Sequence, residues 1–118
     1  MRSEIEKVLE AMREDYRRWA VHFECSDEAS EARKEEMIAN YENGLKVEEH
    51  RRYWKITGTS GSGNSESVKG FVVKAGDKKF REGDLLKPAG WAAPARNFPR
   101  GNVLHGWLYQ NVRWTGIG

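Results

Sequence analysis

A chain of 118 residues, 38% hydrophobic and 32% charged, has room for one domain with a modest core. Its net charge of +2 is divided unevenly, because residues 1–49 hold 8 basic and 14 acidic residues (net −6) and residues 50–118 hold 12 and 4 (net +8). No apolar run approaches the roughly 20 residues of a membrane helix or resembles a secretory signal, and the one cysteine, Cys25, excludes an internal disulfide, so we expect a reduced, cytoplasmic protein with no membrane partner.

The first predicted element is an amphipathic helix over residues 3–23. Its apolar residues recur at steps of three and four, which places them on one face: Ile5, Val8, Leu9, Met12, Tyr16, Trp19, Ala20 and Phe23. This stripe carries more aromatic surface than a solitary helix needs. We therefore expect a homo-oligomer, a dimer or higher, that forms through this face.

A second helix is predicted from Ser26 to Gly44. Ser26, Asp27 and Glu28 are typical of a helix start, and Asn43-Gly44 is typical of a helix end. Its apolar stripe is weaker: Ala29, Ala32, Met37, Ile38, Tyr41 and Leu45. The two helices form either a hairpin or one long bent helix, and residues 1–45 make up an acidic helical segment.

Residues 46–118 are predicted to form a basic antiparallel β module, which makes the fold class α+β. After a Gly/Ser loop over residues 58–65, short apolar runs alternate with glycine turns. The predicted strands are residues 53–57, 68–74, 79–81, 83–87, 103–104, 107–109 and 112–115. Many short strands of this kind favour a small curled sheet or a barrel.

The segment over residues 88–102 is longer than a routine connection and is stiffened by three prolines. Arginine binds phosphate bidentately, aromatic rings stack on bases, and asparagine amides read polar edges, so the composition suits an anionic ligand that carries a flat ring. The candidate ligand-binding residues are Arg96, Asn97, Arg100, Asn102, Trp91 and Phe98. Second-tier basic residues are Lys78, Lys79, Arg81 and Arg113. Alternatively, the two rings plug a barrel and the polar residues satisfy loop carbonyls.

Enzymatic signatures are weak. The Gly/Ser loop lacks the Gly-Lys-Ser/Thr ending of a phosphate-binding loop. His22 and Cys25 have the spacing of two zinc ligands, but no second pair exists, and His50 and His105 are isolated. We therefore expect no catalytic residues, no metal and no cofactor.

The C-terminal module carries a resemblance. Residues 78–91 read KKFREGDLLKPAGW, and they are followed by APARN at 93–97, RGNV at 100–103 and WTG at 114–116. This pattern resembles a family of small uncharacterised proteins from tailed phages, over roughly residues 40–118. The resemblance implies a phage origin and a location in the cytoplasm of the infected bacterial host. Short phage proteins of this kind often inhibit host machinery, including bacterial immune systems.

Three function classes follow. The favoured hypothesis is a non-enzymatic phage protein that sequesters an anionic, nucleotide-like ligand and so inhibits host defence. A nucleic-acid-binding module is the second, and it predicts affinity that falls steeply with salt. The third is a protein–protein inhibitor that acts on a host protein through the acidic helical half.

Overall fold

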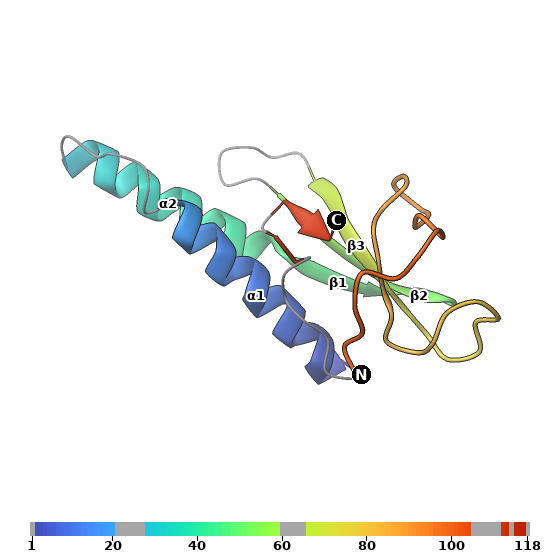
Figure 1. Cartoon of the computed structure of the whole chain (residues 1–118). Coiled ribbons are helices and arrows are strands. Elements are labelled where there is room, and N and C mark those ends of the chain that lie inside the picture. Colours follow the sequence, from blue (N-terminus) through green and yellow to red (C-terminus); the bar gives the residue numbers. More distant parts are fainter. Residues whose placement is uncertain (1, 21–27, 60–65, 105–111, 114, 118) are drawn as a thin grey trace.

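The computed structural model describes residues 2–20, 28–59, 66–104, 112–113 and 115–117. Two helices precede a small antiparallel sheet, which confirms the α+β prediction (Figure 1). The elements in chain order are α1 (Arg2–Ala20), α2 (Glu28–Gly44), β1 (Lys46–Glu49), β2 (Tyr53–Thr59), β3 (Glu66–Val73), β4 (Leu85–Leu86), β5 (Val112–Arg113) and β6 (Gly116–Ile117). None of the described helices is long and apolar enough to cross a membrane.

The helices form an antiparallel hairpin, not a single bent rod. The rings of Tyr16 on α1 and Tyr41 on α2 stack with their centroids 4.2 Å apart and their planes 4° from parallel. Arg17 forms an ion pair with Glu42 across the same junction. One end of the hairpin packs on the sheet and the other projects from it (Figure 1), so the molecule is elongated, measuring 54 × 27 × 24 Å.

The apolar stripe of α1 forms much of the core, as its periodicity predicts. The buried members are Ile5, Val8, Leu9, Met12, Tyr16 and Ala20. Trp19 differs, because 37% of its surface stays exposed, and Phe23 lies outside the described residues. Self-association through this face stays a prediction.

The sheet has the strand order β1-β2-β3-β4, with every neighbouring pair antiparallel. Ile56 pairs with Gly70 and Thr57 with Val68, so Lys69 is an extra residue that forms a bulge in β3. Strands β5 and β6 form a separate two-stranded ribbon. In the described parts of the chain, therefore, the sheet is open and not a closed barrel.

The two faces of the sheet are covered differently. Ile56 and Val72 face the helices and join the larger core cluster, together with Leu45 and Ile117. On the opposite face a smaller cluster holds Phe71, Val73, Phe80 and Leu86. The irregular segment after β3 supplies Phe80, and neither of the two described helices contributes a residue to this second cluster. In Figure 1 both helices lie on the other side of the sheet.

Several predicted strands are wrong. Residues 79–81 form no strand, and 79–80 bend because the Asp77 carboxylate accepts hydrogen bonds from the backbone N–H groups of Lys79 and Phe80, which closes a turn. Residues 103–104 also form a turn, capped by Asn102. The strand predicted over 83–87 shortens to β4, and β1 is a strand that the sequence analysis missed. The strand predicted at 107–109 lies outside the described residues.

Candidate functional site

The long segment over residues 88–102 is fixed to the sheet by backbone hydrogen bonds. The N–H of Leu85 donates to the carbonyl of Gly101 (2.8 Å), and the N–H of Arg100 donates to the carbonyl of Leu85 (2.7 Å). Further along, the N–H of Ala95 donates to the carbonyl of Lys87 (2.7 Å). The segment is therefore an ordered loop that holds its side chains in defined places.

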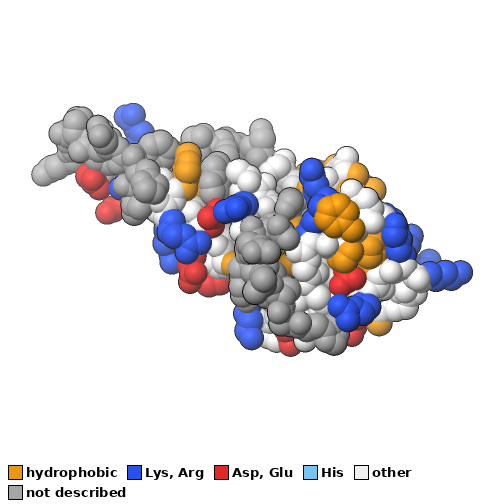
Figure 2. Space-filling model, viewed as in Figure 1, with side chains coloured by type: hydrophobic (Ala, Val, Ile, Leu, Met, Phe, Trp, Pro, Cys, Tyr) orange, Lys and Arg blue, Asp and Glu red, His pale blue; other side chains and the backbone are white. Residues whose placement is uncertain are grey.

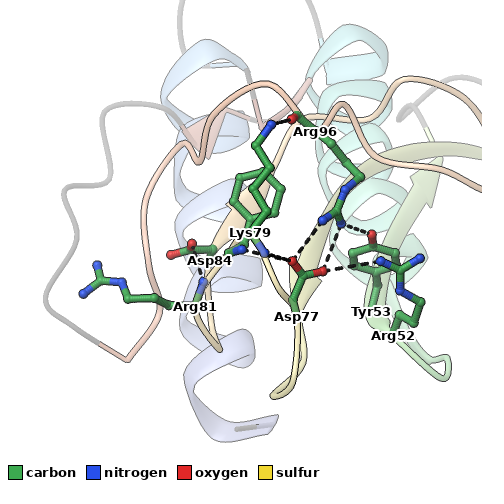
Figure 3. A network of polar contacts seen from close by, with 8 residues as sticks. Arg52, Tyr53, Asp77, Lys79, Arg81, Asp84 and Arg96 are labelled. Atoms are coloured by element: carbon green, nitrogen blue, oxygen red, sulfur yellow. Dashed lines mark hydrogen bonds and ion pairs between the residues drawn. The ribbon is translucent and has the colours of Figure 1, made fainter.

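Arg96 is committed to contacts within the protein. Its guanidinium donates to both carboxylate oxygens of Asp77, at 2.9 and 3.0 Å, and to the hydroxyl of Tyr53 (Figure 3). The Asp77 side chain is only 3% exposed. Hydrogen bonds from Arg96 are the main cause that lowers the pKa of Asp77, and the same pair raises the pKa of Arg96. Arg96 is thus one side of an internal ion pair, and not an outward-facing clamp.

The two asparagines of the loop also have structural partners. Asn97 accepts a hydrogen bond from the N–H of Phe98 through its side-chain oxygen (2.9 Å). Asn102 is buried; its amide donates to the carbonyl of Glu82 (3.0 Å) and to the carboxylate of Asp84 (2.7 Å). Asn102 therefore pins the loop to the turn before β4, and its amide is not presented to a ligand.

Trp91 and Phe98 lie on the surface, with exposed fractions of 54% and 53%. The ammonium of Lys55 lies 3.8 Å from the Trp91 ring centroid, and the guanidinium of Arg100 lies 3.7 Å from that of Phe98. The alternative in which these rings plug a barrel is therefore wrong. Both stay accessible to a partner.

A basic pocket of about 560 Å³ opens where three segments meet. The turn between β1 and β2, the turn after β3, and the long loop each contribute to it. Its lining residues are Arg51, Arg52, Lys74, Ala75, Gly76, Asp77, Lys78, Lys79 and Arg96. We call this the basic pocket. Six of these nine residues are cationic and one is acidic, so the pocket has a surplus of positive charge.

The cationic side chains of the basic pocket differ in whether they have a hydrogen-bond or ion-pair partner within the protein. Lys79 donates to the backbone carbonyl of Arg96, and the guanidinium of Arg52 lies 3.5 Å from the Asp77 carboxylate (Figure 3). Lys74 pairs with Glu49 at 2.7 Å. Within the described ranges, Arg51 and Lys78 have no ion pair or hydrogen bond through their side chains. These two cations are available to an incoming anion.

The structure brings together only part of the predicted site. Lys78, Lys79 and Arg96 line the basic pocket, but Arg81 extends away from the Asp77 cluster (Figure 3), and Arg113 is exposed on β5. On the face shown in Figure 2, basic side chains are interspersed with apolar ones over the sheet and its loops. Three cations of the pocket, Arg51, Arg52 and Lys74, are not among the residues predicted from the sequence. A predicted strand over 46–49 would have placed Arg51 and Arg52 in a hairpin turn.

In the described residues, no group of three or more histidine, cysteine or acidic side chains could hold a metal ion. His50 lies 3.1 Å from Glu48 at an exposed turn. The other two histidines, His22 and His105, and Cys25 lie outside the described residues. The zinc-like spacing of His22 and Cys25 is therefore not tested.

The fold and its pocket define a small α+β protein with a cationic surface site. The chain belongs to DUF7717, a family of unknown function that matches residues 2–117. No curated protein and no solved structure matches the chain.

Proposed function

We propose that this protein is a non-enzymatic binding protein that captures an anionic, nucleotide-like ligand in the basic pocket. The observation that carries the proposal is the charge of the lining, six cations around one carboxylate that is already paired with Arg96. Arginine side chains bind phosphate through two parallel hydrogen bonds, and lysine ammonium groups bind it as point charges. A pocket lined by both kinds of side chain therefore suits a phosphate group.

The Asp77–Arg96 pair supports binding by organising the pocket before the ligand arrives. Asp77 also accepts hydrogen bonds from the turn that follows β3, so it fixes that turn beside Arg96. An incoming anion can then contact the side chains of Arg51 and Lys78 with little rearrangement of the backbone. An ordered site loses less entropy on binding than a mobile one.

The biological setting of the proposal rests on the resemblance to phage proteins and not on geometry. In that setting the protein would sequester a nucleotide signal and so inhibit a host defence that depends on it. Nucleotide binding by the purified protein is the first requirement of this role. A protein that binds no nucleotide could not act in this way.

Calorimetry with pyrophosphate, AMP, ADP and cyclic AMP tests the pocket directly. We expect binding of at least one of them by the wild-type chain. Replacing Arg51 and Lys78 together (Arg51→Gln with Lys78→Gln) should lower the affinity by about a hundredfold or more, since each charge-assisted hydrogen bond contributes about 1.5–3 kcal/mol and two are lost.

Arg81→Gln provides a control, because it removes one positive charge from a side chain that extends away from the pocket (Figure 3). It should leave the affinity within about twofold of wild type. The proposal would be overturned if none of the four ligands bound detectably. It would also be overturned if the control and the pocket variant lost the same amount of affinity.

A further inference from the structure

Trp91 and Phe98 are two exposed rings on the same loop, and together we call them the aromatic shelf. Each ring is about half exposed, and each has a cation on one face, Lys55 for Trp91 and Arg100 for Phe98. A cation on one face fixes the position of a ring and makes its surroundings positive. The exposed surface of each ring is then available to a flat partner.

The loop that carries the shelf is held in place. The N–H groups of Ala89 and Gly90 both donate to the carbonyl of Ala93, at 3.0 and 3.1 Å. Pro88 and Pro94 lie opposite each other as an isolated antiparallel β-bridge. The neighbouring side chains are small or apolar and exposed: Ala89, Ala92, Ala93 and Pro99. Exposed apolar surface of this kind on an ordered loop marks an interaction site.

Charge restricts the occupant of this site. From Leu85 to the last residue the sequence contains no Asp or Glu, while Lys87, Arg96, Arg100 and Arg113 are basic. The partner must therefore be anionic and must also present flat rings. A single-stranded nucleic acid has both properties, since its bases are unpaired and free to stack. A duplex hides its base faces, and an acidic peptide lacks regularly spaced rings.

Arg96 links the basic pocket to the loop that carries the shelf. This residue lines the pocket, its carbonyl accepts the hydrogen bond of Lys79, and Phe98 follows two residues later, within about 7 Å along the chain. A polymer that stacks on the shelf can thus place a neighbouring phosphate in the pocket.

We infer that the aromatic shelf stacks bases of a single-stranded polynucleotide whose phosphate backbone enters the basic pocket. This inference rests on the proposed function, because the pocket supplies the phosphate contacts. It extends the ligand class from a single nucleotide to a polynucleotide, which contacts the shelf as well as the pocket.

Fluorescence anisotropy with labelled oligothymidylate of about 12 nucleotides tests the inference. The oligonucleotide should bind more tightly than thymidine monophosphate and more tightly than the same sequence in a duplex, and its affinity should fall steeply as salt rises. Trp91→Ala and Phe98→Ala should each weaken oligonucleotide binding about fivefold or more. Binding of the monophosphate should change little in either variant.

Trp19→Ala is the matched control, because Trp19 is also an exposed tryptophan but lies on α1. It should leave oligonucleotide binding unchanged. If the mononucleotide binds and the shelf variants do not affect the oligonucleotide, the inference fails while the proposed function stands. Equal binding of poly-glutamate at matched charge would also overturn it. If the Arg51→Gln with Lys78→Gln variant binds both ligands as wild type does, the pocket itself is refuted.

Discussion

Asp77 organises the candidate site at the level of single residues. It accepts two hydrogen bonds from Arg96, accepts two more from the backbone of Lys79 and Phe80, and lies 3.5 Å from the guanidinium of Arg52. One carboxylate thus joins the turn after β3, the turn before β2 and the long loop. Its removal should affect stability and ligand binding in opposite directions.

Asp77→Asn should lower the free energy of unfolding by about 1.5 kcal/mol, the low end for hydrogen bonds to charged groups, because Arg96 is one-third exposed and asparagine can keep the turn. Because the asparagine oxygen still accepts the hydrogen bonds that order the turn, the same variant keeps the pocket organised and loses its one negative charge. It should therefore bind pyrophosphate roughly fivefold more tightly. Urea denaturation and calorimetry measure the two effects.

Glu82→Gln is the control for this variant, because it removes a negative charge from an exposed side chain outside the pocket lining. It should change neither the free energy of unfolding nor the affinity for pyrophosphate appreciably. An Asp77→Asn protein that binds pyrophosphate more weakly than wild type would contradict an anion site at this carboxylate.

The Asp77–Arg96 pair also predicts how stability depends on pH. The folded protein lowers the pKa of Asp77 below its ordinary value of 3.8, so the pair contributes stability in full above that value. This contribution is lost as the pH falls through 3.8 toward the lower folded-state pKa. The difference in unfolding free energy between wild type and Asp77→Asn should be constant above about pH 5 and shrink below it. A difference that grows on acidification would be inconsistent with the pairing.

Sequence reasoning identified three of the pocket's six cations, Lys78, Lys79 and Arg96, but not their partners. Composition alone marks Arg96 as a phosphate-binding candidate. Its actual partners, Asp77 and Tyr53, are 19 and 43 residues away in the sequence, and no local pattern predicts such a contact. The burial of Asn102 against Asp84 was missed for the same reason.

At the scale of elements, strong periodicity was the reliable guide. The stripe on α1 predicted its buried face, and Tyr41 and Leu45 of the weaker second stripe are also buried. Ala32 is exposed, because the first half of α2 projects beyond the sheet (Figure 1). Strand β1 escaped prediction because its sequence, KVEE, has one apolar residue and three charged ones, which is typical of an exposed edge strand.

The packing of β6 against β3 depends on a glycine. Gly116 has a φ of +131°, and a Cβ there would lie 2.8 Å from the carbonyl oxygen of Lys69 on β3. Gly116→Ala should therefore lower the free energy of unfolding by more than about 1 kcal/mol. Thermal or urea denaturation measures the loss.

Gly90→Ala is the matched control, since a Cβ at Gly90 meets nothing within 4 Å. It should leave stability nearly unchanged. Equal stability of the two alanine variants would show that β6 does not lie against β3 as described.

For the molecule as a whole, the division of charge in the sequence corresponds to a division in space. The described residues of the acidic part, 2–20 and 28–49, form the two helices and β1, and the described residues of the basic part form the other strands and the loops between them (Figures 1 and 2). The proposed ligand site lies in the basic part. The acidic hairpin should therefore be dispensable for ligand binding.

Glu35→Lys with Glu36→Lys tests this separation, because both residues are exposed on the projecting half of α2. At about 0.15 M salt the double variant should change nucleotide affinity less than twofold, since charges separated by more than about 8 Å are largely screened. Calorimetry with ADP measures the effect. If the variant abolished a cellular activity but kept nucleotide binding, a host protein that contacts the hairpin would be the better explanation of function.

The position of the bound anion is the most direct test of the account. An amide NMR titration of the wild-type chain with ADP reports on every backbone N–H at once. The basic pocket predicts saturable shifts that are largest at residues 51–52 and 74–79, with smaller ones near Arg96 and little change along α1. Shifts that are absent, or that concentrate on the helices, would contradict the proposal that this pocket binds anionic ligands.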